Sequence, residues 1–158
     1  MNLELIRAVL DDPSEDAVQE LLDDAETVFW VDWREEDDAI VDACEAVLRT
    51  GKLAGEYVEV NTDDGYEVYV RYGDRRVKVP LSYGERDRHL TLCALNQALS
   101  PDYEVRFCRD TNGGDALAFL PLPTKAWAEL ERRYGAALVR RFHRITERPN
   151  LFTDPLPS

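Results

Sequence analysis

The sequence is poor in the residues that most often carry catalytic or metal chemistry. Its 158 residues include two histidines and three scattered cysteines, Cys44, Cys93 and Cys108. An odd, dispersed set of cysteines favours reduced thiols over a disulfide framework. No histidine or cysteine pair has the spacing of zinc ligands, so neither a metal nor another cofactor is expected.

Long hydrophobic runs are also absent. None approaches the roughly 20 apolar residues that cross a membrane. The first residues, MNLELIRAVLDD, lack the basic start and long apolar centre of a signal peptide. We therefore expect a cytoplasmic protein with no membrane contact. The length predicts a single domain, to which we assign residues 1–148, followed by an irregular tail at 149–158.

Acidic residues are in excess, and they are unevenly distributed. The net charge is −13, and residues 1–70 hold 21 acidic against 4 basic side chains, whereas residues 71–158 hold 11 against 15. An acidic half of this strength repels nucleic acid and attracts a basic partner. Solubility alone would also explain a negative total, although not so uneven a split. The charge predicts a basic protein partner and no nucleic acid.

The stretch at 28–42, VFWVDWREEDDAIVD, turns abruptly from apolar to acidic. Its first four residues predict a buried strand that includes Trp30. Asp32 is expected to end this strand and to cap a helix over 34–49, with Glu35 at the capping-box spacing. The acidic residues after it fill the first helical turn, where they offset the helix dipole. They are Glu35, Glu36, Asp37 and Asp38.

The remaining pattern predicts an α+β protein with a mainly antiparallel sheet and helices packed on one face. The expected order is αα-β-α-βββ-α-ββ-α. Further helices are predicted at 2–10 and 14–22, after a capping box at 82–85, and over a long apolar stripe from Trp127 to Ile145. Further strands are predicted at 56–61, 66–72, 75–81, 103–108 and 116–120.

No candidate for catalysis is persuasive, so we predict that the chain is not an enzyme. His89 and Cys93 are four residues apart on one helix, but Cys93 adjoins the apolar stripe, where a free cysteine acts as a small hydrophobe. Asp63 and Asp64 precede Gly65 in what reads as a turn, since the other ligands of a calcium loop are missing. Gly113 and Gly114 lack the lysine of a phosphate-binding loop.

Two resemblances concern function. The order of elements from Glu35 onward, including EYVEVNTDDGYEVYVRYGDRRVKVPL and LTLCALNQAL, resembles type III secretion chaperones, although the strand at 28–31 and the helices before it depart from that pattern. The size, the acidic half and the lack of catalytic groups make the chain similar to bacterial immunity proteins, which neutralise antibacterial toxins.

The second resemblance implies a binding protein that neutralises a toxin by steric and electrostatic masking. A secretion chaperone that binds an effector along its sheet, and an enzyme of unknown type, remain alternatives. Trp33 follows the capping position and is the candidate aromatic anchor of the interface. The residues expected to contact the partner are Asp32, Trp33, Glu35, Glu36, Asp37, Asp38, Asp63 and Asp64.

Overall fold

The computed structural model describes residues 1–61, 63 and 65–157, and its helices and strands follow the predicted order up to the segment after the sixth strand. The helices are α1 (Leu3–Asp11), α2 (Glu15–Leu22), α3 (Asp37–Leu48), α4 (Asp87–Leu99), α5 (Thr124–Tyr134) and α6 (Ala136–Arg141), with a 3-10 turn, η1 (Arg109–Thr111). The strands are β1 (Phe29–Asp32), β2 (Leu53–Glu59), β3 (Tyr66–Tyr72), β4 (Arg75–Lys78), β5 (Tyr103–Cys108), β6 (Ala116–Pro123) and β7 (Phe142–Arg144). The predicted α+β class is confirmed.

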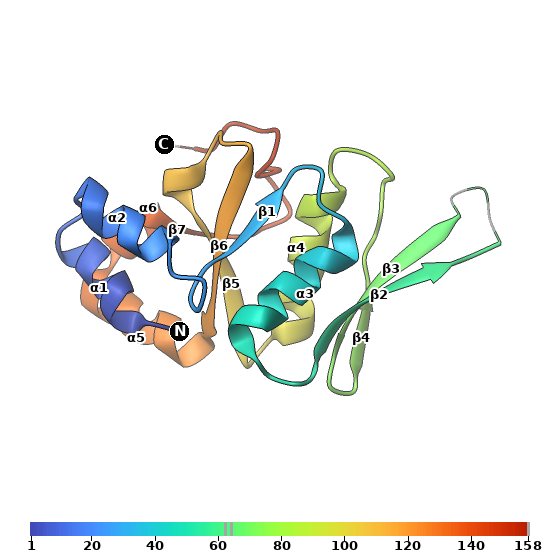
Figure 1. The fold of residues 1–158 in the computed structure, drawn as a ribbon, viewed down its shortest axis with the longest axis horizontal. Helices are drawn as coiled ribbons and strands as arrows, with labels where there is room; N and C mark the ends of the chain where they lie inside the picture. Colours follow the sequence, from blue (N-terminus) through green and yellow to red (C-terminus); the bar gives the residue numbers. More distant parts are fainter. Residues whose placement is uncertain (62, 64, 158) are drawn as a thin grey trace.

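The strands form two antiparallel sheets, of order β1-β6-β5-β7 and β2-β3-β4. Figure 1 shows four layers: the outer helices α1, α2, α5 and α6, the four-stranded sheet, the central helices α3 and α4, and the three-stranded sheet. The sequence predicted a single sheet with helices on one face, and this arrangement is wrong. Helices cover both faces of the four-stranded sheet.

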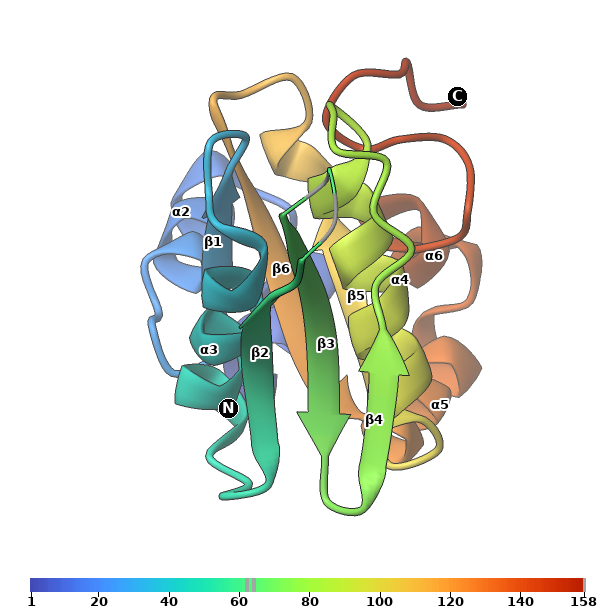
Figure 2. The same ribbon diagram turned by 90° about the vertical axis from the view of Figure 1, so that its right-hand side faces the viewer.

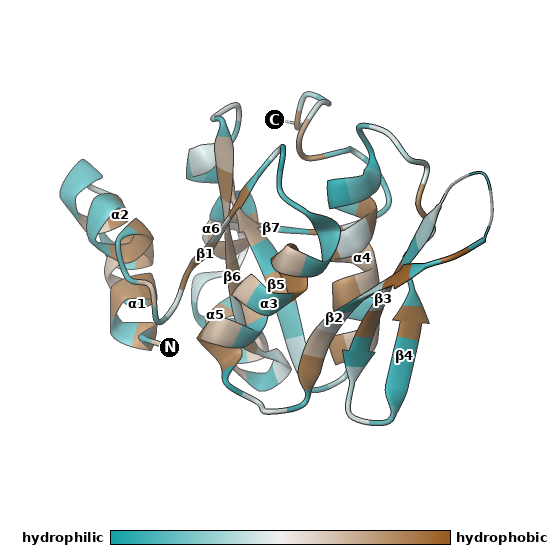
Figure 3. Cartoon of the chain, turned by 45° about the vertical axis from the view of Figure 1, so that its right-hand side comes forward, coloured by the Kyte–Doolittle hydropathy of each residue, from teal (hydrophilic) through white to brown (hydrophobic). Residues whose placement is uncertain are grey.

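The composition of β6 explains why helices pack on both faces of this sheet. Its sequence, ALAFLPLP, has no alternation of polar and apolar residues, and its six central residues are buried. A strand buried on both faces reads as a continuous apolar run. Phe119 packs into the core between the sheets, whereas Leu120 packs against the outer helices. Hydrophobic colours accordingly follow β1 and β6, and hydrophilic colours the β1–α3 loop (Figure 3).

The three-stranded sheet has one buried face and one exposed face. Val68 and Val70 point into the core, while Glu67, Tyr69 and Arg71 lie on the opposite face. Figure 2 shows this sheet from its outer side. Ion pairs cover that side, including Lys78 to Glu67 at 3.2 Å and Arg76 to Glu56 at 3.3 Å.

A close backbone contact joins β2 to the start of α3. A Cβ atom on Gly55 would lie 2.6 Å from the carbonyl oxygen of Asp38, nearer than real Cβ contacts allow. Only glycine permits this approach. The contact brings the N-terminal turn of α3 directly against the three-stranded sheet, and so fixes where the acidic segment lies.

The long C-terminal helix predicted from Trp127 to Ile145 is wrong in its second half. Gly135 adopts φ = 55° and divides the segment into α5 and α6. Phe142 to Arg144 then form β7, which pairs with β5. The apolar spacing was compatible with one helix, but a positive φ interrupts a right-handed helix.

The helix starts agree with the sequence pattern in part. Ser14 caps α2, since its hydroxyl accepts a hydrogen bond from the Ala17 amide at 3.1 Å. The capping box at 82–85 is wrong, because α4 begins at Asp87. The Asp87 carboxylate instead reaches back to the amides of Ser82, at 2.7 Å, and Gly84, at 3.2 Å.

We expect Trp127→Ala to reduce the free energy of unfolding by roughly 3–5 kcal/mol, which is typical of a buried aromatic residue. Trp127 is 1% exposed, and its indole N–H donates to the Glu104 carbonyl at 2.8 Å. Urea unfolding measures the effect. Trp30→Ala is the matched control, because Trp30 is 42% exposed and should cost much less. Equal stabilities of Trp127→Ala and the wild type would contradict this assignment of the core.

Candidate functional site

Four connecting segments meet at one end of the molecule, as Figures 1 and 2 both show. They are the β1–α3 loop, the segment before α4, the β5–β6 connection and the chain after β7. Two pockets at this end share Trp33, Phe152 and Thr153 among their lining residues. Trp33, in the β1–α3 loop, therefore stands between the two pockets.

Trp33 is 55% exposed, the largest exposed fraction among the large hydrophobic residues described. The turn before it is fixed by Asp32, whose carboxylate accepts the Arg34 amide at 2.8 Å. The prediction that Asp32 caps a helix is therefore wrong, since it forms a turn at the end of β1. The Trp30 prediction is also wrong, because strand alternation buries Phe29 and Val31 and leaves Trp30 outside.

The acidic residues after Trp33 differ sharply in exposure. Glu36 is exposed, and Glu35 and Asp38 are partly exposed. Asp37 is only 5% exposed, although the sequence predicted that it would contact a partner. Its carboxylate accepts the Thr91 hydroxyl at 2.9 Å and lies 3.4 Å from Nε of Arg88. Burial raises the pKa of Asp37, and Arg88 opposes that shift.

Asp63 is exposed in the β2–β3 connection, and Asp64 lies outside the described residues. Gly65 has φ = 83°, in keeping with the turn predicted there.

Three aromatic residues that were not predicted to be part of the site line a pocket beside Trp33: Tyr66, Tyr83 and Phe152. We call the pocket beside Trp33 the aromatic pocket. Its volume is about 510 Å³, and its walls include Trp33, Tyr66, Tyr83 and Phe152. Tyr83 meets Tyr66 edge-on at a ring distance of 5.2 Å, and its hydroxyl donates to the Tyr66 carbonyl at 2.7 Å. Tyr57 stacks on Tyr66, also at a ring distance of 5.2 Å.

The chain after β7 forms one wall of the aromatic pocket and is packed against the core. Leu151 is buried, and Phe152 lies 6.4 Å from the Phe119 ring. The adjacent apolar residues Leu151 and Phe152 are the one feature of the sequence that indicates that this irregular segment packs against the core. Its lack of periodicity hid that signal, because periodicity detects helices and strands only.

His89 holds this chain segment in place. Its Nε2 lies 2.7 Å from the Thr146 carbonyl, and its Nδ1 lies 3.3 Å from the Leu151 amide nitrogen. A carbonyl only accepts and an amide N–H only donates, so the ring is neutral with its proton on Nε2. The pKa of His89 is lowered, chiefly because burial disfavours the charged ring.

The possible His89–Cys93 catalytic pair is not assembled. The Cys93 thiol is directed at the same Thr146 carbonyl, at 3.7 Å. Burial raises the pKa of Cys93, which opposes formation of the thiolate nucleophile. Among the described residues, no group of three or more histidine, cysteine and acidic side chains could hold a metal ion. Within the same residues, no helix is long and apolar enough to cross a membrane.

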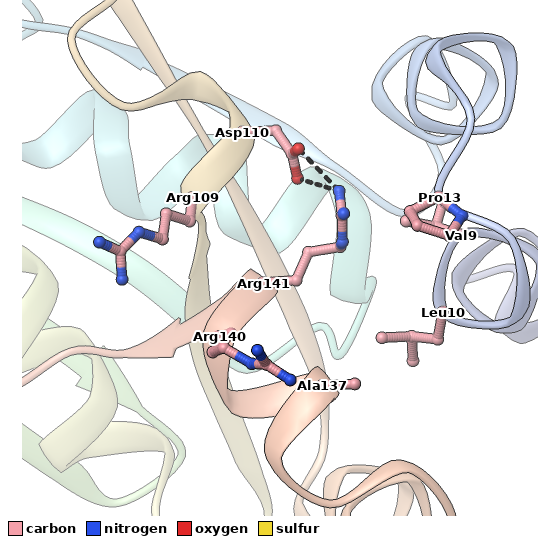
Figure 4. A pocket seen from close by; sticks show the side chains of 8 residues that line it. All are labelled: Val9, Leu10, Pro13, Arg109, Asp110, Ala137, Arg140 and Arg141. Atoms are coloured by element: carbon pink, nitrogen blue, oxygen red, sulfur yellow. Dashed lines mark hydrogen bonds and ion pairs between the residues drawn. The ribbon is translucent and has the colours of Figure 1, made fainter. Parts of the chain in front are cut away.

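Another pocket, of about 420 Å³, lies between α1 and α6 and contains three arginines (Figure 4). Arg141 is paired with both Asp110 carboxylate oxygens at 2.7 Å. Figure 4 shows Arg109 directed away from Leu10 and Pro13, and Arg109 donates to the Pro157 carbonyl. Arg140 donates to the Ala136 carbonyl at 3.3 Å. The three guanidinium groups therefore do not converge on a common point.

Comparison with known proteins found no family model, no curated protein and no solved structure that matches this chain.

The pKa of a histidine in the unfolded chain is about 6.5, and the pKa of buried His89 is lower. The free energy of unfolding should therefore fall as the pH is lowered from about 6.5 to the pKa of folded His89. In this pH range the histidine is protonated in the unfolded chain but stays neutral in the folded protein, so protonation favours unfolding. The free energy of unfolding should fall in total by about 1.4 kcal/mol for each pH unit by which the pKa of folded His89 lies below that of the unfolded histidine. Urea unfolding across this pH range measures the slope.

His89→Gln should remove the part of the slope that His89 contributes, whereas His143→Gln, the control, should retain it. The pKa of His143 is also lowered, chiefly by burial, so each variant isolates one ring. If His89→Gln keeps the full wild-type slope, this account of the His89 contacts is wrong.

Proposed function

We propose that this chain is a non-catalytic binding protein that neutralises a basic antibacterial toxin by covering the toxin's functional surface. It would act in the bacterial cytoplasm as an immunity protein. The observation that carries the proposal is Trp33, which is 55% exposed between two pockets and beside an acidic loop. Aromatic side chains are enriched at the centres of protein interfaces, and surrounding charges steer the encounter.

The proposed contact surface keeps four of the eight residues predicted from the sequence. Trp33 is its centre, and Glu35, Glu36 and Asp38 form its acidic flank. Asp32 acts indirectly, through the turn that presents Trp33. Asp37 is excluded from the contact surface, because it is buried against Thr91 and Arg88.

Two considerations rank this function above its alternatives. A secretion chaperone would bind an extended peptide along a sheet, using pockets for alternate side chains. The outer face of the three-stranded sheet instead carries ion pairs, with the Arg76 guanidinium 3.6 Å from the Tyr69 ring centre. An enzyme based on His89 and Cys93 is not favoured either, because both side chains are directed at the Thr146 carbonyl.

The first test is a charge reversal of Glu35, Glu36 and Asp38 to Lys. At low ionic strength we expect the association rate with the toxin encoded by the neighbouring gene to fall by about tenfold or more. The defect should shrink with added salt, because the Debye length falls from about 30 Å at 0.01 M to about 10 Å at 0.1 M. Stopped-flow association kinetics at the two salt concentrations measure both effects.

The matched control reverses Asp12, Glu15 and Glu20, which are exposed on the α1–α2 hairpin. It makes the same change in net charge on a different part of the surface and should slow association much less. Equal slowing by the two variants would mean that net charge alone governs the encounter. A neighbouring gene product that is harmless to cells lacking this protein would exclude the immunity function.

A further inference from the structure

The aromatic pocket has walls suited to a cation. Trp33, Tyr66, Tyr83 and Phe152 line it from four separate parts of the chain, and Trp33 and Tyr83 are 55% and 41% exposed. A cation over an aromatic ring face is attracted by the negative charge of the π system, most strongly at tryptophan. The Trp33 ring already shows this preference, since the Arg34 guanidinium lies 5.1 Å from its centre.

The polar groups of the pocket add negative charge. Glu85 and Asp87 line it together with a single basic residue, Arg88. The Arg88 charge is offset from below by the Asp37 carboxylate, and one of its nitrogens donates to the Trp33 carbonyl at 3.1 Å. The exposed Glu36 and partly exposed Glu35 extend the negative charge along the β1–α3 loop. The acidic residues here, Glu35, Glu36, Asp37, Glu85 and Asp87, outnumber the basic ones, Arg34, Arg86 and Arg88, so the pocket and its surroundings favour a positive charge.

The backbone at Tyr83 is held in an uncommon conformation. Its φ of 59° is in the left-handed region, which bulky residues rarely adopt. The Asp87 carboxylate fixes the residues on both sides of it, through the amides of Ser82 and Gly84. Residues persist in such conformations only where the surrounding structure holds them, and they are found most often at active and binding sites. The Tyr83 ring thus occupies a preset position in the pocket wall.

We propose that the aromatic pocket binds one lysine or arginine side chain of the partner protein. This inference rests on the proposed function and extends it, by naming what the partner inserts. The alkyl part of such a side chain would contact the aromatic rings, and its charged end would face Trp33 and the exposed carboxylate of Glu85. Asp87 is buried and accepts hydrogen bonds from Ser82 and Gly84, so it adds negative charge without being the direct partner. An anionic side chain would meet the Glu85 carboxylate, and a purely apolar one would leave it without a counter-charge.

The test uses three small probes and the complete protein. They are the N-acetyl, N-methylamide derivatives of arginine, lysine and norleucine, which share an alkyl chain but differ in charge. Each is titrated while the backbone amide and indole N–H signals are followed by two-dimensional NMR. We expect saturable shifts at the Trp33 indole and the Gly84 amide with the two basic probes. Dissociation constants should be on the order of millimolar, and norleucine should give no saturable shift.

Two variants remove parts of the pocket, and a third is the control. Trp33→Ala and Tyr83→Asn should each weaken binding of the arginine probe by about tenfold, and asparagine tolerates the left-handed backbone at position 83. Trp30→Ala removes a comparably exposed tryptophan outside the pocket and should leave binding unchanged. Unshifted amide spectra away from the pocket show that each variant is folded.

The proposal is overturned if the basic probes produce no saturable shift, if norleucine binds equally well, or if the shifts fall away from the pocket. These results are separable from the function itself. Failure to protect cells from the neighbouring toxin, with normal binding of the arginine probe, would reject the immunity function but keep the cation site. Protection that survives in Trp33→Ala and Tyr83→Asn, with no probe binding, would reject the cation site alone.

Discussion

The buried carboxylate of Asp37 is the contact on which the proposed binding end depends. It joins the first residue of α3 to α4 through the Thr91 hydroxyl, at 2.9 Å, and Arg88, at 3.4 Å. Arg88 also donates to the Trp33 carbonyl at 3.1 Å, so the same contact fixes the loop that carries Trp33. Breaking a buried pair leaves an uncompensated charge and costs about 3–5 kcal/mol. The position of Trp33 is therefore coupled to the packing of the two central helices.

The four-layer arrangement separates the acidic half of the sequence into two groups. The α1–α2 hairpin carries one group, and it packs on the same face of the four-stranded sheet as the arginine-rich α5 and α6. The hydroxyl of Tyr134, in α5, donates to Asp11 at 3.0 Å across this boundary. Folding therefore brings part of the acidic first half of the sequence, the α1–α2 hairpin, beside part of the basic second half, α5 and α6. The acidic residues of the β1–α3 loop belong to the other group, on the far side of that sheet.

The order of helices and strands as far as α5 was predictable because it depends on local patterns. Polar and apolar residues alternate from Tyr66 to Arg71 along the predicted strand, and Ser14, which caps α2, stands at the predicted start of that helix. The division into two sheets was not predictable, since strand pairing depends on contacts between distant segments. The signal that was overlooked is β6, whose apolar residues are continuous and require cover on both faces.

The candidate site was predictable only where it depends on neighbouring residues in the sequence. Trp33 was selected because it follows an apolar run and precedes acidic residues, and it is indeed exposed. Asp37 could not be distinguished from its acidic neighbours, because its burial depends on Arg88 and Thr91, more than fifty residues away. Tyr83 and Phe152 reach the same pocket from segments without periodicity, so only the folded chain brings them beside Trp33.

The central claim is that Trp33 anchors the complex with a basic toxin, and its most direct test is the affinity of that complex. Calorimetric titration of Trp33→Ala should give a dissociation constant at least about thirtyfold weaker than the wild type, as expected for an interface hot spot. Trp30→Ala, which removes the other exposed tryptophan near β1, should change it little. An unchanged affinity for Trp33→Ala, or an equal loss for both variants, would contradict the account.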